Sequence, residues 1–267
     1  MNNAYITLVS SMNYIEPAII LARARKDVKS QYPLVVMITE DIYDEAINFF
    51  KEENILPAKI PYLHYSRTTE ENAPHDYIPR IASKMACFMF KDYDKMVYLD
   101  ADCIVLRNID DLFKYPDGAM YRETGMDGGF AGLYVFCPKN HHLEWYMCIL
   151  QNFDIWEADL LKDLWFPFKT NEDYQIPEDY FQNVTNEAFE QCINLNTIKC
   201  LHFCYFTKPW KFKTEEEFSN ELYGREDTNL NISNKRNIII DYYFKKYLLP
   251  LREQYGEVLL HYSLGNR

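Results

Sequence analysis

Short apolar runs that alternate with helix-like segments recur through the first hundred residues of this chain. Residues 34–39 (LVVMIT) form a continuous, largely β-branched run, which is typical of a parallel strand covered on both faces. Residues 4–10 and 95–100 read in the same way, and residues 58–63 form a weaker strand. The alternation predicts an α/β fold with an open, mostly parallel, Rossmann-like sheet and helices on both of its faces.

The segments between these strands have the periodicity of amphipathic helices. We expect helices at about 14–29, 42–53 and 80–91, and Asp41 is placed to cap the second of them. Residues 66–79 are polar and contain two prolines, which predicts a loop.

The pattern changes after residue 115. Residues 153–177 are rich in aromatic side chains and support no assignment, and Pro250 is expected to kink or end the last helix. No repeat or linker interrupts the chain, so we expect a single domain over 1–267, divided at about residue 115 into two halves. The elements expected in the second half are strands at 118–122, 132–137 and 198–204 and helices at 140–152, 178–189 and 236–255.

The charge and the cysteines limit the class of protein. The net charge of −12 argues against non-specific binding to nucleic acid or to anionic membranes, because both need a basic surface. No run is long enough for a membrane-spanning helix. Seven cysteines without a CxxC pair, together with the lack of a signal peptide, predict free thiols and a cytoplasmic location. The sequons at Asn183 and Asn231 are then incidental.

Asp100 and Asp102 flank Ala101 at the end of the strand predicted at 95–100. Ligands of open parallel sheets bind at the carboxyl ends of the strands. Two carboxylates around one small residue can both reach one hard cation, Mn²⁺ or Mg²⁺, whose other positions phosphate oxygens and water fill. The alternative is a solvated turn with two exposed acids. Apolar residues on both sides of the triplet favour the metal site, because unpaired charge within a buried strand is costly.

Four further side chains are candidates, each with a structural alternative. His202 lies in an apolar strand, where it is either a third metal ligand or a hydrogen-bonded core residue. Lys208 can neutralise a phosphate or lie on the surface. Lys84 lies on the helix before the strand at 95–100, where the structural alternative is a solvated helix face. Asp179, beside Glu178, either orients a sugar or caps a helix.

The glycines at 128, 129 and 132 bracket Phe130 and Ala131. They allow the backbone to approach a ligand closely, or they form an ordinary turn between strands.

Several segments resemble the glycogenin-like and galactinol synthase-like branch of glycosyltransferase family eight. The opening AYITLVSSMNY is similar to the nucleotide-binding first strand of that family, and the 31-residue block SKMACFMFKDYDKMVYLDADCIVLRNIDDLF is similar to its signature block. GGFAGLYVFCP resembles "F-N-S-G-V-F-V", and LHFCYFTKPW resembles "H-F-x-G-x-x-K-P-W". The segments follow one another in the same order as the motifs of that family, and they extend from residue 4 to residue 210.

The resemblance implies a GT-A fold with a nucleotide-binding half at about 1–115, and a donor-sugar and acceptor half at about 116–267 that includes a smaller acceptor-side subregion. It also implies dependence on Mn²⁺, a UDP-sugar donor and retention of the anomeric configuration. The matching metal ligands are Asp100, Asp102 and His202. The other matching positions are Leu8, Ser10 and Tyr14 around the uridine, Lys84 and Lys208 near the sugar or diphosphate, and Asp179 near the donor sugar.

Three departures from the family pattern concern the sugar rather than the metal. Phe130 and Ala131 replace an Asn-Ser pair, Tyr205 replaces a glycine, and Tyr180 replaces a glutamine. The loop at 66–79 is expected to close over the donor.

The function that follows is the transfer of a hexose, glucose or galactose, from a UDP-sugar to a carbohydrate, polyol or protein acceptor, and a homodimer is left open. The main rival is a UDP-sugar-binding protein that has lost catalysis. A second rival, a phosphatase of the haloacid dehalogenase type, would carry its acids near the first strand rather than the fourth.

Overall fold

The computed structural model describes eight stretches of the chain: residues 1–63, 82–122, 129–152, 160–161, 171–184, 196–203, 208–223 and 240–264. The loop predicted at 66–79, the sequon at Asn231 and the substituted Tyr205 lie outside the described residues.

A seven-stranded sheet forms the centre of the fold, in the order β3-β2-β1-β4-β7-β6-β8. The first four of these strands run parallel, β7 is antiparallel to β4 and β6, and β8 is parallel to β6. The mostly parallel sheet predicted from the alternation of strands and helices is therefore confirmed. Its strands are β1 (Asn3–Val9), β2 (Leu34–Ile38), β3 (Leu56–Lys59), β4 (Lys95–Leu99), β6 (Ala119–Arg122), β7 (Gly129–Phe136) and β8 (Gln175–Ile176).

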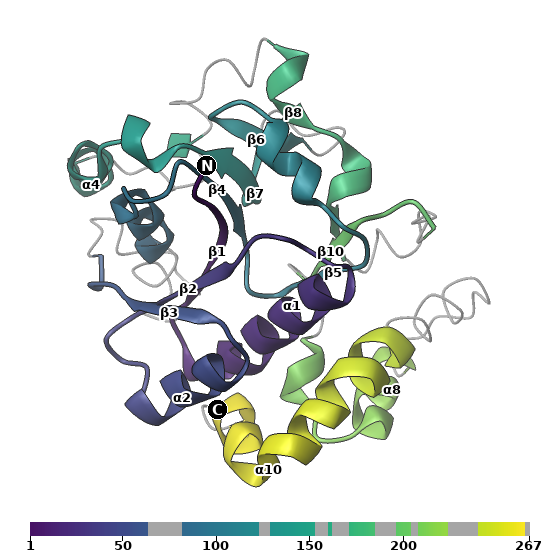
Figure 1. The fold of residues 1–267 in the computed structure, drawn as a ribbon. Helices are drawn as coiled ribbons and strands as arrows, with labels where there is room; N and C mark the ends of the chain where they lie inside the picture. The colour runs from purple at the N-terminus through teal and green to yellow at the C-terminus, as the bar shows by residue number, and fades with distance from the viewer. Residues whose placement is uncertain are drawn as a thin grey trace.

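Helices cover both faces of this sheet (Figure 1). Alternate residues of β1 enter two separate apolar clusters, because successive side chains of a strand point to opposite faces. Tyr5 and Val9 pack with α1 (Ile15–Asp27) and α2 (Asp44–Glu52). The second cluster lies on the opposite face of the sheet. It contains residues of β1, of the 3₁₀ helix η2 (Ser83–Met89) and of α4 (Leu143–Asn152).

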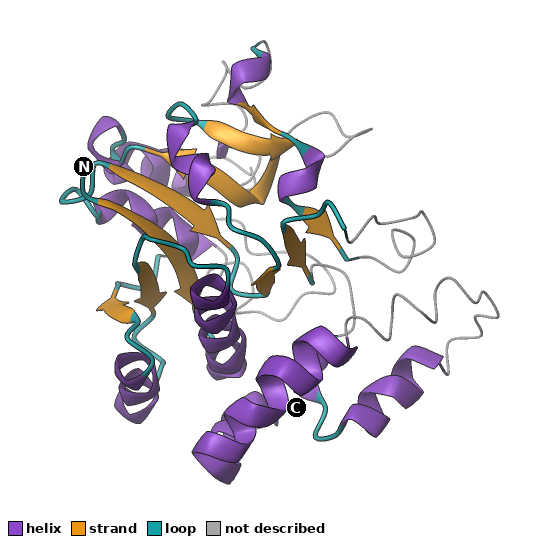
Figure 2. Ribbon diagram, turned by 45° about the vertical axis from the view of Figure 1, so that its right-hand side comes forward, coloured by secondary structure: helices purple, strands orange, loops and turns teal. Residues whose placement is uncertain are grey.

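The C-terminal segment forms a further layer, in which α10 packs against α1 (Figure 2). A π-helical segment, η8 (Ile240–Leu248), leads directly into α10 (Leu249–Leu264). The helix does not end at Pro250, but its geometry changes from π to α between Leu248 and Leu249, directly before this proline. The backbone leaves helical geometry instead at Gly256, where φ is 66°.

A second, three-stranded sheet has the order β5-β10-β9. It consists of β5 (Cys103–Val105), β10 (Cys200–His202) and β9 (Gln182–Asn183). The helix predicted at 178–189 is wrong at its start: a 3₁₀ turn, η6 (Glu178–Tyr180), is followed by β9, whose residues pair with β10. Long-range pairing with β10 decides the conformation here, and a local periodicity cannot reveal it.

Several element ends differ from the prediction. Asp41 does not cap α2: Tyr43 is the N-cap residue, and the Asp41 carboxylate accepts a hydrogen bond from the Thr39 hydroxyl. β3 lies at 56–59 rather than at 58–63. Among the described helices, none is long and apolar enough to cross a membrane.

Candidate metal centre

The Asp100-Ala101-Asp102 turn joins the two sheets, because β4 ends just before it and β5 begins just after it. The Asp100 N–H donates to the Gly132 carbonyl of β7 (3.0 Å), and the Cys103 N–H donates back to the Asp100 carbonyl (3.2 Å). The turn therefore lies at the carboxyl end of a parallel strand, as the sequence predicted. Gly132 lies within β7, so the expected turn between strands does not include it.

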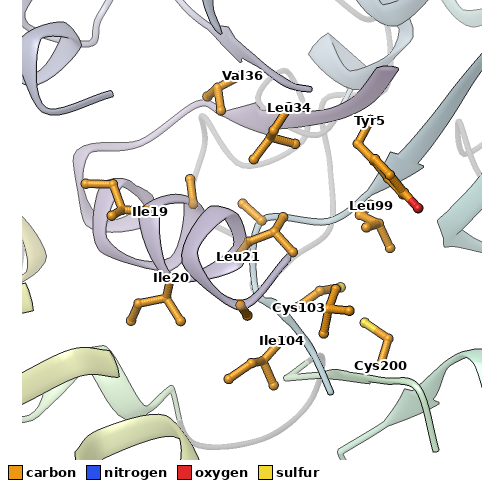
Figure 3. Close-up of a cluster of buried hydrophobic side chains, with 14 of the residues drawn as sticks. Tyr5, Ile19, Ile20, Leu21, Leu34, Val36, Leu99, Cys103, Ile104 and Cys200 are labelled. Carbon is orange, nitrogen blue, oxygen red and sulfur yellow. The ribbon is translucent and has the colours of Figure 1, made fainter. Parts of the chain in front are cut away.

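The strand that follows the turn is anchored in the core. Figure 3 shows Cys103 and Ile104 near Leu21 of α1, with Cys200 of β10 on the other side. Cys103 and Cys200 are both buried free thiols, as expected for a cysteine that packs as a small apolar side chain. Since α1, β5 and β10 share one apolar cluster, the metal-site turn has a rigid support.

His202 ends β10 and pairs with Cys103 of β5 in the small sheet. Its Nε2 lies 3.0 Å from Asp102 Oδ1 and 3.5 Å from Asp100 Oδ2. One ligand atom from each of these three residues lies within 4.8 Å of the other two. His202 and Asp102 are buried, and the Asp100 side chain is 22% exposed. The fold thus brings together three residues that are separated by up to 102 positions in the chain, between Asp100 and His202.

The second oxygen of each carboxylate is fixed by another group. Asp100 Oδ1 accepts a hydrogen bond from the Tyr98 hydroxyl (3.0 Å) and lies 3.6 Å from Lys84 Nζ. Asp102 Oδ2 lies 2.5 Å from Lys208 Nζ, which also donates to the Phe203 carbonyl. Each carboxylate therefore turns one oxygen to a fixed donor and the other to His202.

The charges around Asp102 keep it ionised. Burial by itself raises the pKa of this carboxyl, but the positive charges of His202 and Lys208 and their hydrogen bonds outweigh burial and hold the pKa well below its ordinary value. A carboxylate that stays charged while buried is a ready ligand for a cation.

The donor set suits a hard divalent cation. Carboxylate and imidazole ligands fit Mn²⁺, and adjacent ligands of an octahedral ion with bonds of about 2.1 Å are about 3 Å apart. The separations of 3.0 and 3.5 Å from His202 Nε2 are close to that value. Asp100, Asp102 and His202 therefore fit a metal of this class.

Several known proteins are similar to this chain in sequence, and several solved structures are similar to it in fold. A family model described as "Mannosyltransferase putative" matches residues 5–127. Galactinol synthase 1 of Solanum lycopersicum is 27% identical over 256 residues, covering 85% of this chain and 78% of that protein. Glycogenin-1 of Caenorhabditis elegans is 25% identical over 224 residues, covering 79% of this chain and 51% of that protein.

Among solved structures, the galactosyltransferase LgtC in complex with donor and acceptor sugar analogs has a TM-score of 0.53 at 15% identity, covering 87% of this chain and 99% of that chain. The glycosyltransferase GlyE of Streptococcus pneumoniae TIGR4 has a TM-score of 0.54 at 16% identity, covering 87% of this chain and 63% of that chain. The chain is a relative of the family-eight glycosyltransferases. Its fold is the GT-A fold.

The positions that match the uridine site of family eight lie at the start of the chain. Ser10 follows β1 directly, at the carboxyl end of that strand, and Leu8 is a buried residue within it. The Tyr14 ring, in η1 (Met12–Tyr14), makes an edge contact with Trp210 at 5.7 Å between ring centroids. Trp210 comes two residues after Lys208, so the first strand and the lysine segment meet near this edge. The uridine contacts themselves stay a prediction.

Asp179 contacts a different group of residues. Its carboxylate lies 3.8 Å from Lys199 Nζ, and its carbonyl accepts from the Lys199 N–H, at the start of the segment that leads into β10. His202 is three residues further on, or about 10 Å along an extended strand. The predicted role of Asp179 at the donor sugar stays untested.

Tyr180, which replaces the family glutamine, has a structural role. Its hydroxyl donates to Asp111 Oδ2 (2.5 Å), and Lys199 Nζ lies 3.3 Å from the centroid of its ring. Phe130 and Ala131 belong to β7, where Phe130 pairs with Tyr121; their side chains lie outside the described residues.

The sequence analysis missed two residues of the site, Tyr98 and Asn183. Tyr98 shares a face of the chain with Asp100, two positions away, which a period-two reading of the strand would have revealed. Asn183 has no such signal, and its Oδ1 lies 2.8 Å from His202 Nδ1. Asn183 is 2% exposed, so the sequon that it begins cannot carry a glycan in the folded protein.

Proposed function

We propose that this chain is a retaining glycosyltransferase that moves a hexose from a UDP-sugar to a carbohydrate, polyol or protein acceptor. The observation that carries the proposal is the convergence of Asp100 Oδ2, Asp102 Oδ1 and His202 Nε2 at the carboxyl end of β4. In this proposal the three residues hold Mn²⁺, or Mg²⁺ in its place. When bound, the cation supplies positive charge beside the diphosphate leaving group.

The lysines of the site add fixed positive charge at the same place. Lys208 Nζ contacts Asp102, and Lys84 Nζ lies near Asp100. Both lysines would face a diphosphate held at this edge, where Lys208 stabilises the charge that develops on the leaving phosphate. These charges allow a protein of net charge −12 to bind a negatively charged diphosphate substrate.

Retention requires the acceptor hydroxyl to arrive on the face that UDP leaves. Two routes are open: a dissociative same-face reaction and a covalent intermediate on a carboxylate. Asp179 is the carboxylate that the family pattern favours, and its contact with Lys199 favours an orienting role over that of a nucleophile.

The donor is inferred from relatives, and these differ. The names of the galactinol synthases and of LgtC favour a galactosyl donor, and the matching family model is named for a mannosyltransferase. A donor screen with purified protein and Mn²⁺, measuring nucleotide release from UDP-galactose, UDP-glucose and GDP-mannose, separates them. We expect turnover with a UDP-hexose; turnover with GDP-mannose alone would overturn the UDP assignment.

The metal ligands are tested by Asp102→Asn. We expect transfer to fall about 1,000-fold, because the loss of metal binding removes several kcal/mol of charge stabilisation. Asp44→Asn is the matched control, since Asp44 pairs with Lys59 on an exposed part of α2. Full transfer activity in Asp102→Asn would contradict the proposal.

A second candidate function is UDP-sugar binding without catalysis. It is favoured by Tyr180, which replaces the glutamine of the family pattern and whose hydroxyl donates a hydrogen bond to Asp111. Thermal stabilisation by UDP and Mn²⁺ with no turnover of any donor would support this candidate.

A further inference from the structure

The two ring nitrogens of His202 face different partners. Nε2 faces the carboxylates of Asp100 and Asp102, at 3.5 and 3.0 Å. Nδ1 lies 2.8 Å from Asn183 Oδ1. Asn183 comes from β9, which pairs with β10 so that Asn183 and His202 are direct neighbours. Both side chains are buried, so little water competes for these contacts.

The chemistry of the amide decides which nitrogen carries the proton. An amide oxygen only accepts hydrogen bonds, so Nδ1 must carry a hydrogen and donate it to Asn183. In the neutral ring this leaves the lone pair on Nε2, pointing toward two carboxylate oxygens that also only accept. Three such atoms repel each other unless a cation lies between them, either a proton on Nε2, which makes the ring positively charged beside Asp102, or a metal ion that takes the place of that proton.

We propose that Asn183 is a positioning residue that fixes the Nδ1–H tautomer of His202 and thereby presents Nε2 as a metal ligand. The inference rests on the proposed metal-dependent function. Partners of this kind orient metal-binding histidines and tune their basicity in other proteins. If the amide were turned by 180°, its NH₂ group would face Nδ1 and select the opposite tautomer, so the proposal makes a definite statement about the ring.

The backbone can hold this region without the Asn183 amide. The Val184 N–H donates to the His202 carbonyl (2.7 Å), and the Phe203 N–H donates to the Asp102 carbonyl (3.0 Å). The Phe181 ring also packs beside the imidazole, with 5.1 Å between centroids. A change of the Asn183 side chain can therefore remove the hydrogen bond while β9 and β10 stay paired.

Two variants separate the hydrogen bond from the shape of the side chain. Asn183→Leu keeps a similar branched shape and removes the acceptor, and Asn183→Asp keeps an acceptor oxygen. We expect Asn183→Leu to bind Mn²⁺ about 10- to 100-fold more weakly, as measured by electron paramagnetic resonance of free Mn²⁺. Asn183→Asp should bind within a few-fold of the wild type or more tightly. Circular dichroism and thermal unfolding check that both variants fold.

The tautomer is read directly by ¹⁵N NMR of the histidine rings in the metal-free protein at pH 8. The chain has six histidines, so the His202 signals are assigned by their absence in His202→Gln. We expect Nδ1 to carry a proton in the wild type and in Asn183→Asp, and a mixture of forms with and without this proton in Asn183→Leu.

The outcomes are distinguishable. An Nε2–H tautomer in the wild type, or equal Mn²⁺ affinity of the wild type and Asn183→Leu, would overturn this inference and leave the proposed function standing. A wild-type protein that binds no Mn²⁺ would overturn the metal-dependent function, and with it the role of Nε2 as a ligand. If only Asn183→Leu fails to fold, unchanged tautomer and affinity in Asn183→Asp still support the proposal, and loss of either in that variant contradicts it.

Discussion

At the scale of single residues, the two oxygens of Asp100 and the two oxygens of Asp102 have the same arrangement of contacts. One oxygen of each is held by a neighbour, Tyr98 for Asp100 and Lys208 for Asp102, and the other faces His202. A carboxylate that is held on one side loses less rotational freedom when it binds a cation on the other. The turn is therefore organised for ligation before any metal arrives.

Asp117 is the centre of a second polar cluster, which is partly buried. Its Oδ1 accepts from the Cys137 N–H and lies 2.8 Å from His141 Nε2, and its Oδ2 accepts from Asn140 Nδ2. Burial raises the pKa of Asp117, but these hydrogen bonds and the charge of His141 outweigh it and lower the pKa below the ordinary value. The folded protein therefore favours the ionised form.

Asp117→Asn should lower the free energy of unfolding by about 1–3 kcal/mol at pH 7. Both oxygens of the carboxylate face hydrogen-bond donors, and the NH₂ group of asparagine cannot accept from them. A lowered pKa stabilises the fold above the unfolded pKa of about 3.9, and the stabilisation is lost as the pH falls through the folded value. The difference from wild type should thus shrink below about pH 4 in urea titrations. A pH-independent difference would contradict this; exposed Asp44→Asn is the control and should change stability little.

The sequence predicted the three residues that converge at the candidate metal centre, since their order along the chain matches the family pattern. It did not predict Asn183, because the contact with His202 depends on the register of two very short strands. It also could not show that Tyr180 is engaged by Asp111, which lies 69 positions away.

At the scale of elements, Arg252 joins α10 to the rest of the fold. Its guanidinium makes two hydrogen bonds of 2.8 Å to Glu16 of α1 and one of 2.7 Å to the Trp210 carbonyl. Glu16 is fully buried, and Trp210 belongs to the segment that begins with Lys208. One side chain therefore holds the C-terminal helix, α1 and the lysine segment together.

Arg252→Met should destabilise the fold by about 3–5 kcal/mol, because it leaves the Glu16 carboxylate buried without its partner. The double variant Glu16→Leu, Arg252→Met should recover much of that loss, since no charge is left unpaired. Chemical denaturation of the single and double variants measures both effects. Arg23→Met is the matched control: Arg23 pairs with Glu53 in a more exposed place, with 19% of its side chain accessible, and should cost less. Additive losses in the double variant would contradict the buried pair.

Elements with a strong local pattern were predicted well, and those that depend on distant partners were not. α1 and β2 lie within two residues of their expected ends. β9 was expected to be helical, and the helix predicted at 80–91 is a 3₁₀ helix at Ser83–Met89. For β9, pairing with β10 overrides a weak local preference.

At the scale of the whole molecule, both sheets cross the boundary expected at residue 115. β4 of the first half pairs with β7 of the second, and β5 pairs with β10. One apolar cluster contains residues from both halves, including Val97 and Val135. The alternation of strands and helices revealed the parallel half, but the small sheet could not be predicted, because its strands are two or three residues long and none is stable without the others.

The expected single domain has a direct test in separated halves. A fragment of residues 1–115 should not fold cooperatively, because it exposes the edge of β4 and leaves β5 without β10. We expect broad, poorly dispersed NMR signals and no cooperative urea transition for this fragment alone, and recovery of both when it is co-expressed with residues 116–267. Binding of Mn²⁺ should return only with the pair, since Asp100 and Asp102 lie in one fragment and His202 in the other. A well-dispersed spectrum and a cooperative transition from residues 1–115 alone would show that the first half is a domain of its own, and the shared sheets would then be an interface between two domains.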